Sequence, residues 1–401
     1  MATWTTKKLK ELTTKIGSGA TPRGGKDSYH KEGTPLIRSL NIYDLSFSYD
    51  GLSFIDESQA KQLDNVTVEK DDVLLNITGA SVCRCTSVPD NLVPSRVNQH
   101  VAIIRADRKN LLGKYLKYVL VSSAYKRELY GLARTGATRE ALTKIDIENF
   151  EIKLPDIEAQ SLIASVLSAY DDLIENNEKR IKALEEMAQL LYTEWFVKFK
   201  FPGHEKVKMV DSGTEYGSIP EGWEVKRFYD VVNNFDSKRK PISSMKRQKI
   251  QGKYPYYGAA KIIDYINDYI FDGRYLLVAE DGSVITPDGK PMLQFVDEKF
   301  WVSNHAHIVQ GKLLSTEILY LRLCRFNIKS LITGSAQPKI TKDNLSRIVF
   351  IVPGEDVKNA FGAIVSHCFD EIFNLQKQDQ NLSKTRDLLI PQLVTGKRIF
   401  K

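Results

Sequence analysis

The chain contains few cysteines and no long apolar segment. Only Cys83, Cys85, Cys324 and Cys368 occur among its 401 residues, and we expect them to be reduced thiols. No run approaches the roughly 18 apolar residues of a membrane-spanning helix. The first residues, MATWTTKKLKELTTKIG, contain lysines but not the apolar centre of a signal peptide. These absences predict a cytoplasmic protein that does not enter the membrane.

Motifs for catalysis and metal binding are also missing. The sequence has no Asn-Pro-Pro-Tyr or Asp-Pro-Pro-Tyr tetrad for adenine methylation and no helicase-type ATP motif. The Gly-Ser-Gly at 17–19 lacks the lysine of a phosphate-binding loop. The pairs Cys83/Cys85 and His305/His307 each offer two ligands on one strand face, whereas a structural zinc site needs four. We therefore predict no catalytic residue and no metal on this chain.

What the chain does contain fits a soluble protein of two domains. Its hydrophobic content is 42% and its charged content 27%, which are ordinary values for globular proteins. A chain of 401 residues exceeds one core and should form two domains of roughly 150 residues each. The net charge of +7 favours a polyanionic partner such as a nucleic acid.

An internal repeat defines those domains. Residues 135–155 read TGATREALTKIDIENFEIKLP, and residues 333–353, which follow at an interval of 198, read TGSAQPKITKDNLSRIVFIVP. Each copy runs into a long helical pattern. A repeat at a fixed interval marks the structural unit, so the chain should be one domain–helix unit used twice.

Weaker echoes extend the repeat. The segments 73–82 and 275–284 match, as do Val97-Asn-Gln-His100 and Val302-Ser-Asn-His305. Residues 73–78 and 101–105 are rich in β-branched residues and predict strands. Helical spacing predicts a helix over 114–130, and the polar stretch 206–218 is interpreted as a linker.

Each repeat is followed by heptads typical of a coiled coil. We expect the two helices to pack as antiparallel partners. The residues predicted to form the contact are Ile163, Leu167, Tyr170, Ile174, Ile181, Leu184 and Leu191 in the first helix, and Phe361, Val365, Ile372, Leu375, Leu382 and Leu389 in the second.

The predicted fold is a duplicated α/β (α+β) architecture with pseudo-two-fold symmetry. Two globular domains would be separated by the two long antiparallel helices. The predicted boundaries are 1–155 and 219–353 for the domains, 156–200 and 354–401 for the helices, and 201–218 for the linker.

Several motifs, in this order, resemble those of the specificity subunits of type I restriction-modification systems. They are Thr21-Pro22 with YHKEGTPLIR at 29–38, PDIEAQ at 155–160, YPYYGA at 254–259, FWVSNHAH at 300–307, GSAQPKI at 334–340 and LLIPQLVTG at 388–396. The resemblance covers essentially the whole chain. It implies two target-recognition domains, each reading one half of a bipartite double-stranded DNA target.

The resemblance also implies partner subunits. The helices would set the spacing of the half-sites and dock two methyltransferase (modification) subunits, and separate restriction (translocase-nuclease) subunits would join for cleavage. S-adenosylmethionine, ATP and Mg would then be bound by the partners, with no cofactor on this chain.

Candidate DNA-binding residues follow from the chemistry of recognition, in which cations hold phosphates and a few polar groups address base edges. The candidate cations are Arg23, Lys26, Arg84, Arg134, Arg139, Lys238, Arg239, Lys240, Lys246, Arg247, Lys261, Lys290 and Lys339. The candidates for base discrimination are Asn76, Thr78, Ser81, Glu280, Asp281 and Ser283, and Tyr256 and Tyr257 are candidates for stacking.

Two other functions stay open at this point. The chain could be a self-sufficient DNA modification enzyme or nuclease, which the missing motifs argue against. It could instead be a coiled-coil scaffold that uses its domains to bind proteins.

Overall fold

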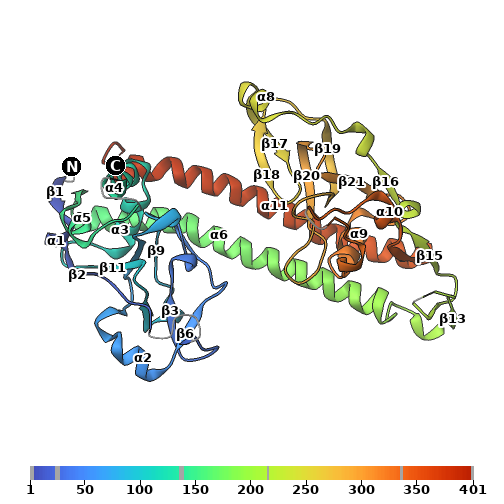
Figure 1. The fold of residues 1–401 in the computed structure, drawn as a ribbon, viewed down its shortest axis with the longest axis horizontal. Coiled ribbons are helices and arrows are strands. Elements are labelled where there is room, and N and C mark those ends of the chain that lie inside the picture. Colours follow the sequence, from blue (N-terminus) through green and yellow to red (C-terminus); the bar gives the residue numbers. More distant parts are fainter. Residues whose placement is uncertain (1–3, 23–27, 135–139, 215, 335–336, 399–401) are drawn as a thin grey trace. The chain divides into compact units, whose positions relative to one another are not determined.

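The computed structural model describes residues 4–22, 28–134, 140–214, 216–334 and 337–398. The chain forms two compact units, one of Met1–Asn176 with Gln378–Lys401 and one of Asn177–Lys377. Each unit combines a mixed α/β domain with a segment of each of two long helices, α6 (Ile157–Tyr192) and α11 (Glu355–Val394) (Figure 1). The predicted duplicated fold is confirmed.

The domain of the first unit contains two four-stranded sheets. Their strand orders are β2-β11-β8-β9 and β6-β3-β10-β7, and β1-β12 and β4-β5 form separate pairs. The strands are β1 (Thr5–Lys8), β2 (Thr13–Ser18), β3 (Thr34–Ile37), β4 (Ile42–Tyr43), β5 (Ser46–Phe47), β6 (Ser53–Ile55), β7 (Thr67–Val68), β8 (Val73–Asn76), β9 (Cys85–Ser87), β10 (Ser95–Val97), β11 (Val101–Ala106) and β12 (Glu151–Leu154). The helices are α1 (Leu9–Leu12), α2 (Glu57–Gln62), α3 (Gly113–Val121), α4 (Ser123–Arg134) and α5 (Lys144–Asn149).

The domain of the second unit has one larger sheet. Its strand order is β16-β21-β19-β20-β17-β18, beside the pairs β15-β22 and β13-β14. The strands are β13 (Met209–Asp211), β14 (Ser218–Pro220), β15 (Glu224–Arg227), β16 (Val232–Asn234), β17 (Gln251–Tyr257), β18 (Ile262–Ile266), β19 (Phe271–Ala279), β20 (Leu293–Val302), β21 (Ala306–Gly311) and β22 (Val349–Val352). The helices are α7 (Phe228–Val231), α8 (Ser244–Lys249), α9 (Thr316–Leu323) and α10 (Lys342–Ser346).

Both domains are built around one buried antiparallel strand pair, β8–β11 in the first and β19–β21 in the second. Successive side chains of a strand point to opposite faces. Accordingly, Leu75 and Leu74 lie in two different apolar clusters on the two sides of β8. Leu276 and Leu277 do the same on β19. This double burial explains why these strands are nearly continuous apolar runs.

The same connections surround this strand pair in both domains. An antiparallel pair of an early strand and the last strand, β1–β12 or β15–β22, closes each domain. A short helix follows this early strand, and its first amide, that of Leu9 or Phe228, donates to Phe150 or Ile348 at 2.9 Å in both cases. Thr143 and Thr341 cap α5 and α10 through their side chains. The repeat seen in the sequence is therefore a repeat of structure.

The long helices run antiparallel within each unit. In the first unit, Ile163 and Leu167 share a core with Ile390 and Leu393. In the second unit, Tyr192 packs against Phe361 with ring centroids 6.3 Å apart. Apolar residues at heptad spacing form such seams.

Ion pairs accompany both seams. Asp171 Oδ1 accepts from Arg386 at 2.8 Å in the first unit, and Arg180 pairs with Glu371 at 2.5 Å in the second. The residues that the sequence assigns to the helix contact are buried or half-buried in α6 and α11.

Three local expectations are corrected. The helix predicted over 114–130 is two helices, α3 and α4, because Ser122 is buried in an extended conformation (φ −56°, ψ 135°) between them. The predicted linker 206–218 contains β13, which pairs with β14. The second long helix, whose heptad pattern in the sequence spans 356–392, extends to Glu355 at one end and to Val394 at the other. No helix in the described part of the chain is long and apolar enough to cross a membrane.

Candidate nucleic-acid interface

A tight turn follows the central strand of the first domain. Residues 78–82, called the first turn, begin just after β8, and Gly79 has a φ of 74°, a value that suits glycine. The amide of Ile77 donates to His100 O at 3.0 Å, and that of Gly79 donates to Glu140 O at 3.1 Å. Leu142 N donates back to Ile77 O at 2.8 Å. Two neighbouring segments therefore fix the start of the turn.

The second domain repeats this arrangement after β19. In residues 281–284, called the second turn, Gly282 has a φ of 76° and donates to Pro338 O at 3.0 Å. Glu280 N donates to His305 O at 2.8 Å, and Ile340 N donates to Glu280 O at 2.8 Å. Each hydrogen bond has its counterpart in the first domain.

These hydrogen bonds correct the alignment of the two turns by one residue. They place Gly79 opposite Gly282, whereas the sequence echo places it opposite Asp281. The reason is a difference in turn length, since Val82 N donates to Gly79 O and Val284 N donates to Gly282 O. Thr78 and Asp281 become equivalent, and both form an isolated bridge, with Ala141 and Lys339 respectively.

The candidates for base discrimination differ in exposure. Thr78, Ser81, Asp281 and Ser283 are half-buried or exposed on the two turns. Asn76 is completely buried, and its amide donates to Ser39 O at 2.9 Å. Its side chain is therefore a structural group and not part of the surface that the turn presents.

The two candidate stacking tyrosines are also buried. Tyr256 is 1% exposed and accepts from Ile242 N at 3.0 Å. Tyr257 is 7% exposed and donates to Glu298 at 2.6 Å. Both belong to the interior around β17, so the structure does not offer them for stacking on a base.

A buried ionic cluster lies directly beneath the second turn. Asp236 and His307 have side chains only 2% and 1% exposed, and His307 Nδ1 lies 2.8 Å from Asp236 Oδ2. His307 Nε2 lies 3.1 Å from Ile340 O. Both ring nitrogens of His307 therefore face oxygen atoms of neighbouring groups.

Arg239 and Glu280 complete the cluster, and neither is a free surface group. Arg239 Nη1 donates to Glu280 Oε2 at 2.7 Å and to Ala306 O at 2.9 Å. Lys339 Nζ lies 3.5 Å from Glu280 Oε1, and Lys342 Nζ lies 3.4 Å from Asp236 Oδ2. The predictions of DNA contact for Arg239 and Glu280 are revised to a role in holding the turn.

Opposite charges keep both carboxyl groups ionised. Burial raises the pKa of Asp236, but hydrogen bonds from His307 and Ile308 and the charge of Arg239 outweigh it, so the pKa lies below its ordinary value. Burial likewise raises the pKa of Glu280, and Arg239, His307 and Lys339 lower it by more. The cluster is thus a set of compensated charges.

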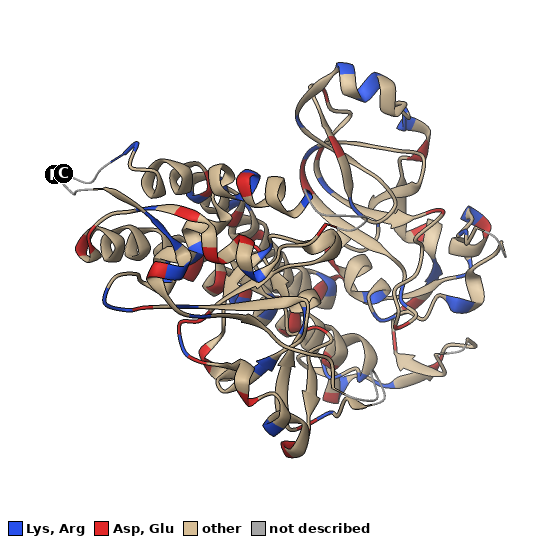
Figure 2. Ribbon diagram, turned by 60° about the vertical axis from the view of Figure 1, so that its left-hand side comes forward, with Lys and Arg blue, Asp and Glu red and all other residues tan. Residues whose placement is uncertain are grey.

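Most of the candidate lysines of the second domain are exposed. Lys238, Lys240, Lys246 and Lys261 are exposed, and Lys290 is half-buried. Lys246 lies on α8, whose blue segments stand at the upper end of this domain in Figure 2. Arg247 on the same helix is instead 14% exposed and paired with Asp264 at 2.9 Å.

Only two of the candidate cations of the first domain, Arg84 and Arg134, lie in the described part of the chain. Arg84 lies over the ring of Tyr43, 4.7 Å from its centroid. Arg134 is exposed and bonds Glu140 at 3.0 Å. Arg23, Lys26 and Arg139 lie outside the described residues.

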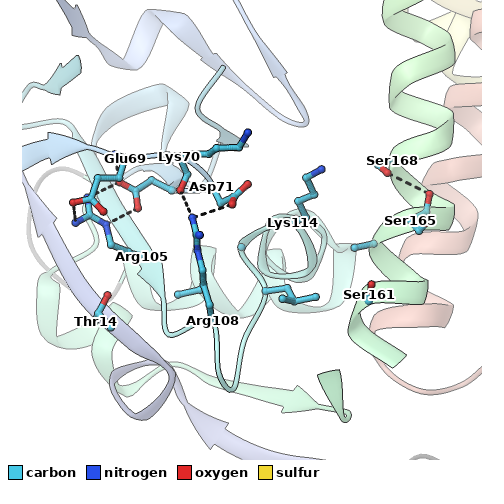
Figure 3. A pocket seen from close by; sticks show the side chains of 15 residues that line it. Thr14, Glu69, Lys70, Asp71, Arg105, Arg108, Lys114, Ser161, Ser165 and Ser168 are labelled. Carbon is cyan, nitrogen blue, oxygen red and sulfur yellow. Dashed lines mark hydrogen bonds and ion pairs between the residues drawn. The ribbon is translucent and has the colours of Figure 1, made fainter. Parts of the chain in front are cut away.

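A cleft of about 760 Å³ lies at the opposite end of β8 from the first turn. Figure 3 shows that its two arginines pair with carboxylates of the same cleft: Arg105 bonds Asp72 and Glu69, and Arg108 bonds Asp71. The exposed Lys114 and three serines of α6 line the other side. The cleft is therefore not part of the surface that the first turn presents.

The cysteines do not form a metal site in the described residues, where no group of three or more potential ligands gathers. Cys83 and Cys85 are buried, and burial raises the pKa of the Cys83 thiol to about 12. A thiol must lose its proton to bind a metal or act as a nucleophile. Both groups therefore behave as apolar core residues.

Comparisons with known proteins agree with this architecture. The type I restriction modification DNA specificity domain matches residues 1–186 and again residues 220–381. The MjaIX specificity subunit of Methanocaldococcus jannaschii, a type I restriction enzyme subunit, is 27% identical over 98% of this chain and 93% of its own length. A putative type I specificity subunit of Haemophilus influenzae is 36% identical over 36% of this chain and 37% of its own length.

A solved structure supports the fold. The type I restriction-modification S subunit from M. genitalium superposes with a TM-score of 0.61 at 16% identity, over 98% of this chain and 96% of that one. Two equivalent domains, each joined to a long helix, define a duplicated recognition protein. The chain belongs to the family of type I restriction-modification DNA specificity subunits, which are non-catalytic DNA-binding subunits.

Sequence reasoning did not select His100, His305 or Asp236 as functional residues. The signal for the two histidines was present, since the Val-x-x-His echo at 97–100 and 302–305 places them at equivalent positions. Asp236 had no signal, because its partners are more than 70 residues away in sequence.

Proposed function

We propose that the chain reads a bipartite target in double-stranded DNA, with residues 1–155 recognising one half and residues 219–353 the other. The observation that carries this proposal is the turn built twice, with the same hydrogen bonds at the end of the same buried strand. A rigid strand end presents a few side chains in a fixed position, as base recognition requires. Each domain thus offers one equivalent recognition point.

The exposed turn residues supply different chemistry in the two domains. Thr78 and Ser81 have hydroxyls that donate and accept, and suit several bases. Asp281 has a carboxylate, which can accept from cytosine N4. The half-sites should therefore differ in sequence, while exposed lysines such as Lys238 and Lys240 hold phosphates of any sequence.

A charge reversal tests DNA binding. The double variant Lys238→Glu, Lys240→Glu should weaken binding of a mixed-sequence duplex by about tenfold or more and reduce the slope of log K against log salt by about 2. Arg239 is left unchanged because it holds the buried cluster. Fluorescence anisotropy of a labelled duplex measures both quantities.

A matched control carries the same change of charge elsewhere in the domain. Lys312 follows Gly311, at the end of β21 away from the second turn, since Ala306 lies beside the turn. Lys226 lies on β15, which pairs with β22 outside the six-stranded sheet. The variant Lys226→Glu, Lys312→Glu should retain most of the affinity. Equal losses in the two variants would mean that only net charge matters, and no loss in either would favour a protein-binding scaffold.

We further propose that α6 and α11 dock two modification subunits. Exposed apolar residues support this role: Leu162 and Leu173 in the first unit, and Met187 and Leu190 in the second. Leu162 and Leu173 are eleven residues apart, and Met187 and Leu190 are three residues apart. The members of each pair therefore lie on one helix face. S-adenosylmethionine, ATP and Mg would be bound by the modification subunits and by the restriction subunits that join for cleavage.

The helices would also set the distance between the half-sites. A helix of 36 residues is about 54 Å long, or about 16 base pairs at 3.4 Å each, which is an upper limit. Inserting one heptad into α6 and one into the facing part of α11 should lengthen the spacer between the modified adenines. Single-molecule mapping of methylated adenines in cells with the partner subunits measures this, and an unchanged spacer would refute the ruler.

A further inference from the structure

A histidine clasps each of the two turns in the same way. His100 Nδ1 lies 2.5 Å from Thr78 Oγ1, and His305 Nδ1 lies 2.5 Å from Asp281 Oδ1. The carbonyl groups of the same two histidines accept the amides of Ile77 and Glu280. Backbone and ring therefore hold the histidine against the turn in both domains.

The anchored nitrogen determines which edge of the ring is presented outward. Nδ1 faces the turn residue, so Nε2 lies on the far side of the ring. The His305 side chain is 48% exposed, and no described residue bonds its Nε2. His100 is half-buried, and its Nε2 lies 3.2 Å from the side-chain Nε2 of the exposed Gln99.

We propose that His100 and His305 contact the DNA backbone, each donating a hydrogen bond from Nε2 to a phosphate oxygen. The inference rests on the proposed DNA-reading function. The turn residues differ between the domains, as Thr78 against Asp281, but the histidine is the same. An identical group at equivalent positions suits the feature that both half-sites share, which is the phosphate backbone and not the bases.

The two contacts differ in their need for a proton. The Thr78 hydroxyl can donate or accept, so a neutral His100 can present an Nε2–H to phosphate once Gln99 turns aside. Asp281 is an acceptor only, and Nδ1–H of His305 donates to it. A phosphate contact through Nε2 then requires the imidazolium form of His305, held between two anions.

Other charged groups also act on His305. Asp281 and Lys339 come from the turn and the segment bridged to it, Glu280 follows β19, and Arg239 donates to Asn304 O beside the histidine. Behind them lie His307, Asp236 and Lys342. Cations and anions of the chain therefore both surround His305, and a DNA phosphate would add one anion.

Two substitutions of His305 separate the phosphate contact from the clasp. The amide nitrogen of asparagine lies close to the position of Nδ1, and that of glutamine lies close to the position of Nε2. His305→Asn should keep the bond to Asp281 and lose the contact, weakening binding of a mixed-sequence duplex by about tenfold and lowering the salt slope by about 1. His305→Gln should retain more of the affinity than His305→Asn.

The order of these two variants decides the proposal. If His305→Asn binds as the wild-type full-length chain does while His305→Gln binds poorly, the histidine only clasps the turn and the proposal is wrong. The same pair at His100 gives an independent repeat. Circular dichroism and the unfolding temperature establish that each variant is folded before its affinity is used.

A pH profile gives the second readout. Binding by the wild-type chain should weaken as the pH rises, because the phosphate contact needs a proton on both ring nitrogens of His305, and His305→Gln should flatten this dependence. A profile that His305→Gln does not alter would overturn the phosphate contact. If the variant Lys238→Glu, Lys240→Glu weakens binding but the histidine variants do not, this inference fails and the proposed function stands.

Discussion

The two domains share a backbone framework and differ in the side chains beneath their turns. In the first domain the position next to Ala102 in the sheet is Ser18, which is exposed at the end of β2. In the second domain, His307 takes the position of Ala102 and Asp236 takes that of Ser18. The two side chains are buried and bonded to each other. The backbone hydrogen bonds of the turn are nevertheless the same. The framework thus depends on main-chain pairing and tolerates very different interiors.

The domains also place their ion pairs at opposite ends of the central strand. In the first domain, Arg105 bonds the fully buried Asp72 just before β8, away from the turn. In the second, Arg239 bonds Glu280 just after β19, at the turn itself. The first turn is held by neutral groups and the second by charges. Perturbing charge should therefore distinguish two turns that look alike in their backbone.

The largest difference is expected from removing a buried carboxylate. Asp236→Ala leaves the buried His307 without its carboxylate partner, and breaking a buried ion pair in this way costs about 3–5 kcal/mol. The loss should be confined to the second domain. Hydrogen exchange measured by mass spectrometry should show faster exchange in peptides from 232–311 and little change in peptides from β8 and β11.

The matched control is Ser18→Ala at the equivalent position of the first domain. Its side chain is exposed, so the change in unfolding free energy should stay within about 0.5 kcal/mol. If Asp236→Ala leaves the exchange of 232–311 unaltered, the cluster does not hold the second turn. If both domains loosen together, the two interiors are not independent.

Lowering the pH should also destabilise the second domain, by a smaller amount. The pKa values of Asp236 and Glu280 are lower in the folded chain than in the unfolded one. Groups of this kind add stability above their unfolded pKa, about 4, and lose it as the pH falls through the folded pKa. The second domain should therefore lose stability progressively below about pH 4.

The loss on acidification should be less steep in an Asp236→Asn variant, which has no carboxyl group to titrate at this site. Urea unfolding followed at several pH values measures the free energy, and hydrogen exchange assigns the change to a domain. An identical acid dependence in the wild type and the variant would show that Asp236 does not contribute to it.

The sequence predicted the parts of this comparison that depend on local pattern. Duplication, the central strands and the heptad seams follow from the repeat, from runs of β-branched residues and from the spacing of 3.5 residues. Local pattern also predicted an uninterrupted helix over 114–130, but tertiary burial of Ser122 breaks it.

The candidate site was predicted less well because its contacts are distant in sequence. The residue types of Asn76 and Tyr256 predict a place on the DNA-facing surface, but Ser39 and Ile242 bond them in the interior. Arg239 is part of a basic run, and only the fold reveals Glu280 as its partner 41 residues away. A cluster of cations in the sequence therefore indicates a surface region, but the fold determines which of these side chains are exposed there.

The smallest effect, and the one that should be equal in both domains, concerns the turn glycines. Gly79 and Gly282 have φ values of 74° and 76°, and nothing within 4 Å would meet an added Cβ at either position. Replacing either by alanine should cost about 1–2 kcal/mol through backbone strain alone. Asparagine, which tolerates a left-handed conformation, should cost less than alanine at both sites. Chemical unfolding with hydrogen exchange of the flanking strands gives both values. Equal costs would show that the two turns have the same backbone requirement, whatever side chains lie beneath them. A much larger cost at Gly282 would mean that the buried charges impose strain on the second turn that the first does not have.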